Sequence, residues 1–117
     1  SETDEPERFY HGFILGLIVE QRENYRIRSN RESGFGRYDV MMIPREHSGK
    51  HLPAIVMEFK VHNSRKEQTL EETVQAALQQ IEDKHYDAEL LAQGFEKAQI
   101  RHYGFAFQGK KVLIAGD

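Results

Sequence analysis

The 117-residue chain has no cysteine, and it has no hydrophobic run near the roughly 18 residues that a membrane-spanning helix needs. The absence of cysteine excludes disulfides and cysteine-ligated zinc, and it fits a reducing compartment. No segment resembles a signal peptide. We therefore expect a cytoplasmic protein without a membrane partner.

The chain also lacks an excess of positive charge. Its 16 Lys and Arg face 19 Asp and Glu, for a formal net charge of −3, which argues against a generic, strongly basic nucleic-acid binder. The signs are unevenly distributed, because residues 22–37 hold five arginines and two glutamates whereas residues 67–89 hold seven acids and one lysine. This pattern is compatible with phosphate contact on one side only. The alternative is a solvated surface of mixed charge.

With 38% hydrophobic and 30% charged residues, the chain is typical of one globular domain over residues 1–117, with residues 1–5 disordered. The expected elements are, in order, a helix from Pro6 to about Arg22, strands over 24–30, 37–43 and 53–61, a single long helix from Thr69 to about Gly94, and strands over 100–107 and 111–116. Thr69 and Glu72 form a capping-box pattern. This order predicts an α/β fold with a mixed sheet, in which the long helix is the crossover connection.

The strand over 53–61, "PAIVMEFKV", carries two charges inside an apolar run. Glu58 and Lys60 are two residues apart, so they point to the same face of the sheet. If this strand and the strand over 37–43 form an antiparallel hairpin centred near residues 48–49, Asp39 lies opposite Glu58, give or take one residue. Two carboxylates at that spacing repel unless a cation or proton intervenes, and Mg²⁺ favours hard oxygen ligands. The alternative for Glu58 and Lys60 is a buried ion pair.

Three polar residues on the helices are candidates for the rim of the same site. Glu7 and His11 share a helical stripe with Ile14 and Ile18, so we expect them to lie where the inward face becomes polar. Gln80 is adjacent to the buried face of the second long helix. The alternatives are a dipole partner for Glu7, a structural histidine for His11 and boundary surface for Gln80.

The spacing of Asp39 and Glu58-Phe59-Lys60 resembles the D…(D/E)-x-K signature of the PD-(D/E)XK nuclease superfamily. The similarity extends over roughly residues 7–116, through "FYHGFILGL", "SNRESGFGRYDV", "IVMEFKV", "ALQQIEDKHY" and "YGFAFQGKKVLIAG". These segments resemble a bacterial nuclease-like domain often found C-terminal to an AAA-ATPase-like module. One departure is that Tyr38, rather than proline, precedes Asp39.

The resemblance implies an αβββαβ core of the restriction-endonuclease type, with Mg²⁺ or Mn²⁺ as cofactor. It implies that Asp39, Glu58 and the Phe59 carbonyl hold the metal and that Lys60 orients or deprotonates the attacking water. Glu7 resembles a helix-one acid that some members place near the metal. Gln80 and Tyr86 resemble a glutamine-then-tyrosine helix motif of RecB-like relatives, although five residues separate them here.

Arg31 and Arg37 flank a glycine-rich turn near the expected metal, where arginine forks suit phosphate oxygens. Gly34 and Gly36 in that turn would let a nucleic-acid backbone approach, and the alternative is a hairpin turn with exposed charges. The leading hypothesis is metal-dependent hydrolysis of nucleic acid, DNA in preference to RNA, with His11 and Tyr86 as further contacts. The alternative is a non-catalytic nucleic-acid-binding or dimerisation domain, with the C-terminal hairpin as the surface of a homodimer within a larger ATPase-linked protein.

Overall fold

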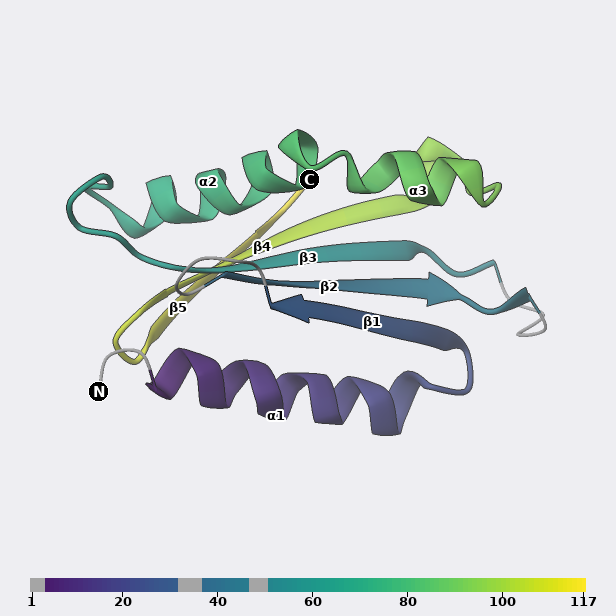
Figure 1. The fold of residues 1–117 in the computed structure, drawn as a ribbon, viewed down its shortest axis with the longest axis horizontal. Helices are drawn as coiled ribbons and strands as arrows, with labels where there is room; N and C mark the ends of the chain where they lie inside the picture. The colour runs from purple at the N-terminus through teal and green to yellow at the C-terminus, as the bar shows by residue number, and fades with distance from the viewer. Residues whose placement is uncertain (1–3, 32–36, 47–50) are drawn as a thin grey trace.

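The computed structural model describes residues 4–31, 37–46 and 51–117, with side chains described from residue 7 onward. It contains five strands and three α-helices (Figure 1). The elements are α1 (Asp4–Gln21), β1 (Tyr25–Arg31), β2 (Arg37–Pro44), β3 (Ala54–Val61), α2 (Leu70–Asp83), α3 (Tyr86–Ala92), a 3₁₀ turn η2 (Lys97–Gln99), β4 (Ile100–Gln108) and β5 (Lys111–Gly116). The expected glycine-rich turn with Gly34 and Gly36 lies outside the described residues.

The five strands form one mixed sheet in the order β1-β2-β3-β4-β5. Neighbouring strands are antiparallel except β3 and β4, which are parallel and are joined by the α2–α3 connection. The predicted α/β class and mixed sheet are therefore confirmed. β5 is an edge strand with exposed Val112 and Ile114. Its use as a dimer surface stays a prediction.

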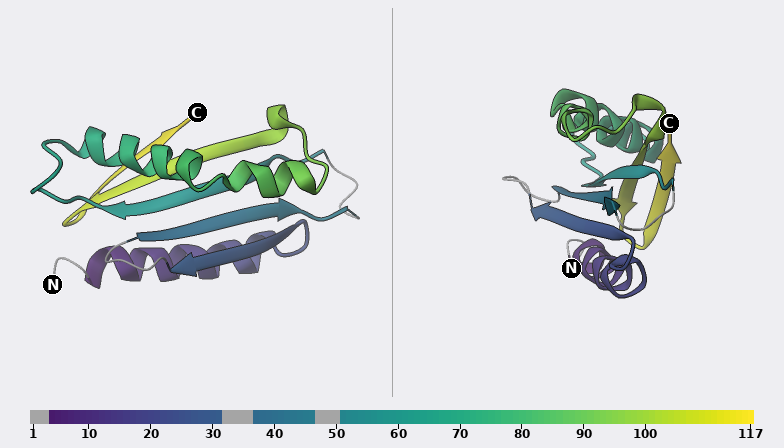
Figure 2. Two further views of the ribbon diagram at one scale, coloured as in Figure 1. Left: turned by 45° about the horizontal axis from the view of Figure 1, so that its top comes forward. Right: turned by 90° about the vertical axis from the view of Figure 1, so that its right-hand side faces the viewer.

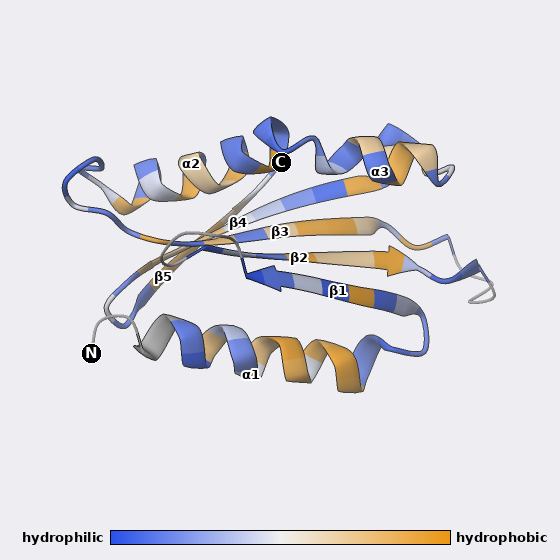
Figure 3. Ribbon diagram, in the orientation of Figure 1, coloured by the Kyte–Doolittle hydropathy of each residue, from blue (hydrophilic) through white to orange (hydrophobic). Residues whose placement is uncertain are grey.

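Helices cover the two faces of the sheet, with α1 on one face and α2 and α3 on the other (Figures 1 and 2). The α1 side buries an aromatic-rich cluster that includes Tyr10, Tyr38 and Phe59. The α2–α3 side buries a smaller aliphatic cluster that includes Val56, Ile81 and Leu90. β3 is apolar along most of its length and β2 toward its end, whereas β1 is hydrophilic toward its end (Figure 3), and nearly every residue of β2 and β3 is buried. The central strands are therefore buried on both faces.

The segment between β3 and β4 contains two helices, so the prediction of one long helix is wrong. α2 ends at Asp83 and α3 begins at Tyr86, with His85 in the left-handed region at φ 54°. The break lets Ile81 and Leu90 both pack on the sheet, although neither glycine nor proline marks the junction. Thr69 caps α2 as predicted by accepting from the Glu72 amide at 3.2 Å. The Glu72 carboxylate accepts from the Gln68 amide instead of closing the box on Thr69.

The first helix begins at Asp4, so Asp4 and Glu5, which we expected to be disordered, are helical. The helix ends at Gln21, one residue before the expected end. In the ranges that the structure describes, no helix combines the length and the apolar character needed to cross a membrane.

Gly104 lets α2 approach the sheet closely beside Glu58. It lies on β4 directly opposite Glu58 of β3. A Cβ added at Gly104 would lie 2.9 Å from the Val74 carbonyl oxygen and 3.3 Å from the Ala77 Cβ. The helix that covers Glu58 therefore depends on the missing side chain at this position.

His102 of β4 ties α3 and the last residue to the sheet. Its Nε2 lies 2.7 Å from Asp87 Oδ1 of α3, and its Nδ1 lies 2.8 Å from Asp117 Oδ1. Burial lowers the pKa of His102, but the hydrogen bonds to Asp87 and Asp117 outweigh burial and raise the pKa above its usual value of 6.5. Because each ring nitrogen faces a carboxylate oxygen, the arrangement favours the doubly protonated ring.

We expect Gly104→Ala to destabilise the fold by about 1–3 kcal/mol, because the new methyl group meets backbone atoms of α2 that cannot rotate away. Urea unfolding measures this change. Gly12→Ala is the matched control, since a Cβ at Gly12 in α1 has no atom within 4 Å and alanine is the better helix former by up to about 1 kcal/mol. Equal stability of Gly104→Ala and the wild type would contradict the close approach of α2.

We also expect His102 to make stability depend on pH. Its folded pKa is raised, so its contribution is fully present below the unfolded pKa of about 6.5 and is lost as pH rises through the folded value. Urea unfolding between about pH 5.5 and 8.5 should show a steeper loss for the wild type than for His102→Gln. His51→Gln, which replaces an exposed histidine, serves as the control and should keep the wild-type slope. Parallel curves for wild type and His102→Gln would refute the assignment.

Candidate functional site

Asp39 and Glu58 lie directly opposite each other on β2 and β3. Directly opposite residues of an antiparallel pair share a face, and this face is the one that α2 and α3 cover. Asp39 is 5% exposed and Glu58 is fully buried. The register predicted from the hairpin is therefore the observed one, and it brings two carboxylates together in the middle of the sheet.

Two neutral side chains orient the Asp39 carboxylate. Asn30, its partner on β1, donates from Nδ2 to Oδ1 at 3.1 Å, and the Tyr86 hydroxyl at the start of α3 donates to Oδ2 at 2.8 Å. Neutral donors hold a carboxylate in place without cancelling its charge. These two contacts fix the direction of the Asp39 carboxylate.

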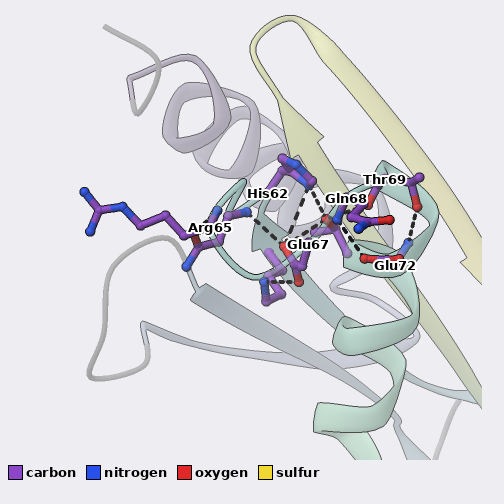
Figure 4. A network of polar contacts seen from close by, with 9 residues as sticks. His62, Arg65, Glu67, Gln68, Thr69 and Glu72 are labelled. Carbon is purple, nitrogen blue, oxygen red and sulfur yellow. Dashed lines mark hydrogen bonds and ion pairs between the residues drawn. The ribbon is translucent and has the colours of Figure 1, made fainter.

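Lys60 is on the same face as Glu58, at the end of β3, and its ammonium is paired with Glu67 of the β3–α2 loop. Lys60 Nζ lies 2.6 Å from Glu67 Oε2, with the two side chains 11% and 10% exposed. Burial raises the pKa of Glu67, but hydrogen bonds from Lys60, the Asn63 amide and Thr73 outweigh burial and hold this pKa below its usual value. Glu67, which Figure 4 shows within its network of polar contacts, is therefore an anion at neutral pH, and Lys60 is its partner in a nearly buried ion pair.

The expectation of an inward-facing side chain is wrong for His11, whereas Glu7 is half-buried and is hydrogen-bonded to Tyr38 of the sheet. The residues of α1 that pack on the sheet include Tyr10, Phe13 and Ile14, whereas the His11 side chain is 65% exposed. Glu7 lies 3.8 Å from His11 and 3.7 Å from Arg31, on the α1 side of the sheet. The structure therefore does not bring Glu7 and His11 to the face that carries Asp39 and Glu58.

Arg31 is the last residue of β1 and Arg37 the first of β2. Arg37 is opposite Lys60 in the register and shares its face. Arg31 is opposite Tyr38, on the α1 face, with its guanidinium carbon 5.8 Å from the centre of the Tyr38 ring. Of the two arginines, only Arg37 is on the face of the carboxylate pair.

Gln80 and Tyr86 lie on different helices. Gln80 is half-buried on α2, three residues after buried Ala77. Tyr86 follows the break between the helices and reaches Asp39, so the structure places it against a candidate metal ligand. The break between the helices therefore separates the two residues, and the catalytic role expected of Gln80 stays a prediction.

Arg28 holds α3 over the site from β1. Its guanidinium donates to both carboxylate oxygens of Glu89, with Nη1 2.6 Å from Oε1. The hydrogen bond raises the pKa of Arg28 and lowers the pKa of Glu89. This two-pronged ion pair fixes the helix that carries Tyr86.

Sequence reasoning missed Asn30 and Glu67. Asn30 could have been found, because a hairpin centred between residues 34 and 35 places it opposite Asp39, as the observed register does. Glu67 gave no such signal, since it lies in an irregular loop seven residues after Lys60 and hairpin geometry does not apply there.

The donor set at Asp39 and Glu58 fits a hard divalent cation. Magnesium takes one or two protein carboxylates, keeps several waters and demands oxygen ligands, and two opposed carboxylates supply these. In their ionised forms, Asp39, Glu58, Glu67 and Lys60 carry two net negative charges. Among residues 4–31, 37–46 and 51–117, no three His, Asp or Glu side chains are grouped to hold a metal ion. A cation here would therefore rely on the carboxylate pair together with backbone oxygen and water.

A comparison with protein families gives a match over nearly the whole chain. The family model described as the PD-(D/E)XK nuclease superfamily matches residues 5–116, which is nearly the whole chain. No curated protein and no solved structure matches the chain.

Proposed function

The chain belongs to the PD-(D/E)XK nuclease superfamily, and from this premise we propose that it hydrolyses phosphodiester bonds of nucleic acid, DNA in preference to RNA, with Mg²⁺ or Mn²⁺. The observation that carries the proposal is the pairing of Asp39 with Glu58 across β2 and β3, with Lys60 on the same face. Two central strands of a sheet rarely hold three charges, because each costs several kcal/mol to desolvate. A catalytic use accounts for that cost.

Asp39 and Glu58 would hold the metal ion, with the Phe59 carbonyl as a third protein ligand. A bound divalent ion supplies Lewis-acid stabilisation of negative charge on the phosphate and lowers the pKa of a bound water. Asn30 and Tyr86 keep the Asp39 carboxylate in a fixed direction before the ion arrives. This fixed direction reduces the reorganisation that binding requires.

Lys60 is the positively charged side chain of the proposed site. Its ammonium has three N–H donors, and one is used on Glu67. The remaining donors suit the attacking water or an oxygen of the scissile phosphate, whose negative charge grows during the reaction. We assign Lys60 to that orienting and charge-stabilising role.

The basic loop after β3 gives the proposed substrate a place to contact the protein. Arg65 and Lys66 are exposed in the same loop that carries Glu67. The Arg65 side chain extends away from the buried network (Figure 4). Arg37 lies on the adjoining strand opposite Lys60. Positive groups at this end of the sheet would position phosphates of a nucleic acid without reading its sequence.

We predict that Asp39→Asn weakens Mn²⁺ binding, measured by calorimetric titration, by at least about a hundredfold, since even indirect partners of a metal ligand are worth about 10–100-fold. Cleavage of DNA should be lost with it, while circular dichroism shows an unchanged fold. Asp83→Asn is the control, because Asp83 is an exposed carboxylate at the end of α2.

Equal Mn²⁺ affinity of Asp39→Asn and the wild type would refute the carboxylate site. Wild-type protein that binds DNA but cuts neither DNA nor RNA would favour the alternative of a binding domain that retains the nuclease fold.

We predict that Arg65→Ala weakens DNA binding similarly for all sequences. The loss of one phosphate contact should reduce the slope of log affinity against log salt by about 0.9 for duplex DNA. Fluorescence anisotropy at several salt concentrations measures both effects. Lys84→Ala removes an exposed lysine between α2 and α3 and should bind like the wild type. An unchanged salt slope in Arg65→Ala would exclude the loop from the substrate contact.

A further inference from the structure

We propose that Glu67 is a positioning residue for the reaction, and that Thr73 and the Asn63 backbone hold it so that it sets the place of the Lys60 ammonium. This inference rests on the proposed nuclease function and adds to it a residue outside the superfamily signature. Its basis is the buried network between the end of β3, the following loop and the first turns of α2 (Figure 4).

Glu67 is held independently of Lys60. Its Oε1 accepts from the Asn63 amide at 2.9 Å and from the Thr73 hydroxyl at 3.0 Å, while its Oε2 accepts from Lys60 Nζ at 2.6 Å. Thr73 is fully buried on the face of α2 that packs on the sheet. One carboxylate oxygen is thus fixed to the scaffold, and the other is left to the lysine.

The hydroxyl of Thr73 has a defined direction in this network. The hydroxyl of Thr73 has one proton, and the groups that only accept it are the Glu67 carboxylate at 3.0 Å and the more distant Thr69 carbonyl at 3.4 Å. His62 Nδ1 lies 2.6 Å from the same hydroxyl oxygen, so the ring donates to Thr73 while Thr73 donates to Glu67. The chain His62 to Thr73 to Glu67 therefore stabilises a negative carboxylate facing Lys60.

Lys60 is the conformationally flexible member of the Lys60–Glu67 ion pair. A lysine side chain has four rotatable bonds, so the backbone of β3 alone does not fix the position of Nζ. The ionised and triply hydrogen-bonded Glu67 does fix it. Without this anion the ammonium is free to move away from the attacking water or the scissile phosphate.

Glu67→Gln tests the role with little change in shape. An amide has one acceptor oxygen, so glutamine gives up either the Lys60 contact or the contacts with Asn63 and Thr73. We expect kcat for cleavage of linear double-stranded or single-stranded DNA with Mn²⁺ to fall about 10–100-fold, as for residues that orient a catalytic group. KM and Mn²⁺ affinity should stay near wild type. Glu72→Gln is the control, because Glu72 accepts from the Gln68 amide in the same segment and glutamine can do the same.

Thr73 provides a second, isosteric test in case Glu67→Gln fails to fold. Thr73→Val keeps the shape and removes the hydroxyl, whereas Thr73→Ser keeps the hydroxyl and removes a methyl group. A positioning role predicts a lower kcat for Thr73→Val and near-wild-type kcat for Thr73→Ser. A purely structural role predicts that kcat is unchanged in both, or falls in both together with stability.

Two failures are distinguishable. Wild-type protein that cuts neither form of DNA and does not cut RNA overturns the proposed function. Cleavage by the wild type with an unchanged kcat in folded Glu67→Gln, or equal kcat values for Thr73→Val and Thr73→Ser, overturns the positioning role and leaves the hydrolysis proposal standing.

Discussion

The rest of the structure depends on three charged side chains in the middle of one sheet, because these side chains need partners from the surrounding elements. Asp39, Glu58 and Lys60 occupy β2 and β3, which are covered on both faces. Charges removed from water cost several kcal/mol each unless partners replace the lost hydration. Asp39 and Lys60 receive partners from outside the two strands: Asn30 from β1 and Tyr86 from α3 for Asp39, and Glu67 from the loop before α2 for Lys60.

The break between α2 and α3 also helps to supply a partner for one of these charges. α2 covers Glu58 and Gly104, and α3 changes direction so that Tyr86 reaches Asp39. α3 is then fixed by charged contacts at two places, from Arg28 to Glu89 and from His102 to Asp87. A short helix of seven residues has little stability of its own, so these contacts decide where Tyr86 lies.

The sequence was most informative where local geometry controls the outcome. The hairpin predicted Asp39 opposite Glu58 because strand pairing is set by the centre of the connection and by alternation of faces. The pattern failed for His11, which is exposed because aromatic packing by Tyr10 and Phe13 decides which side of α1 faces the sheet. Glu7 does approach the sheet, but at Tyr38 and on the face opposite to the carboxylate pair. The pattern also failed for the α2–α3 break because tertiary packing of Ile81 and Leu90 outweighs a continuous helical pattern. Glu67 was beyond such reasoning, since an irregular loop has no period that places its side chains.

A signature such as D…E-x-K specifies where the Cα atoms of its residues lie. How well these Cα positions determine the position of each charged group depends on the length of the side chain. Asp39 and Glu58 are short enough for the register to bring their carboxylates together. Lys60 is long, and its charge is located by a residue that the signature does not contain. Another chain could keep the same three letters on the same strands and, with a different loop, place its ammonium elsewhere. The signature therefore predicts the position of the two carboxylates more firmly than it predicts the position of the lysine ammonium. The β3–α2 loop, which locates that ammonium here, is where chains with this fold can differ in the geometry of the proposed reaction.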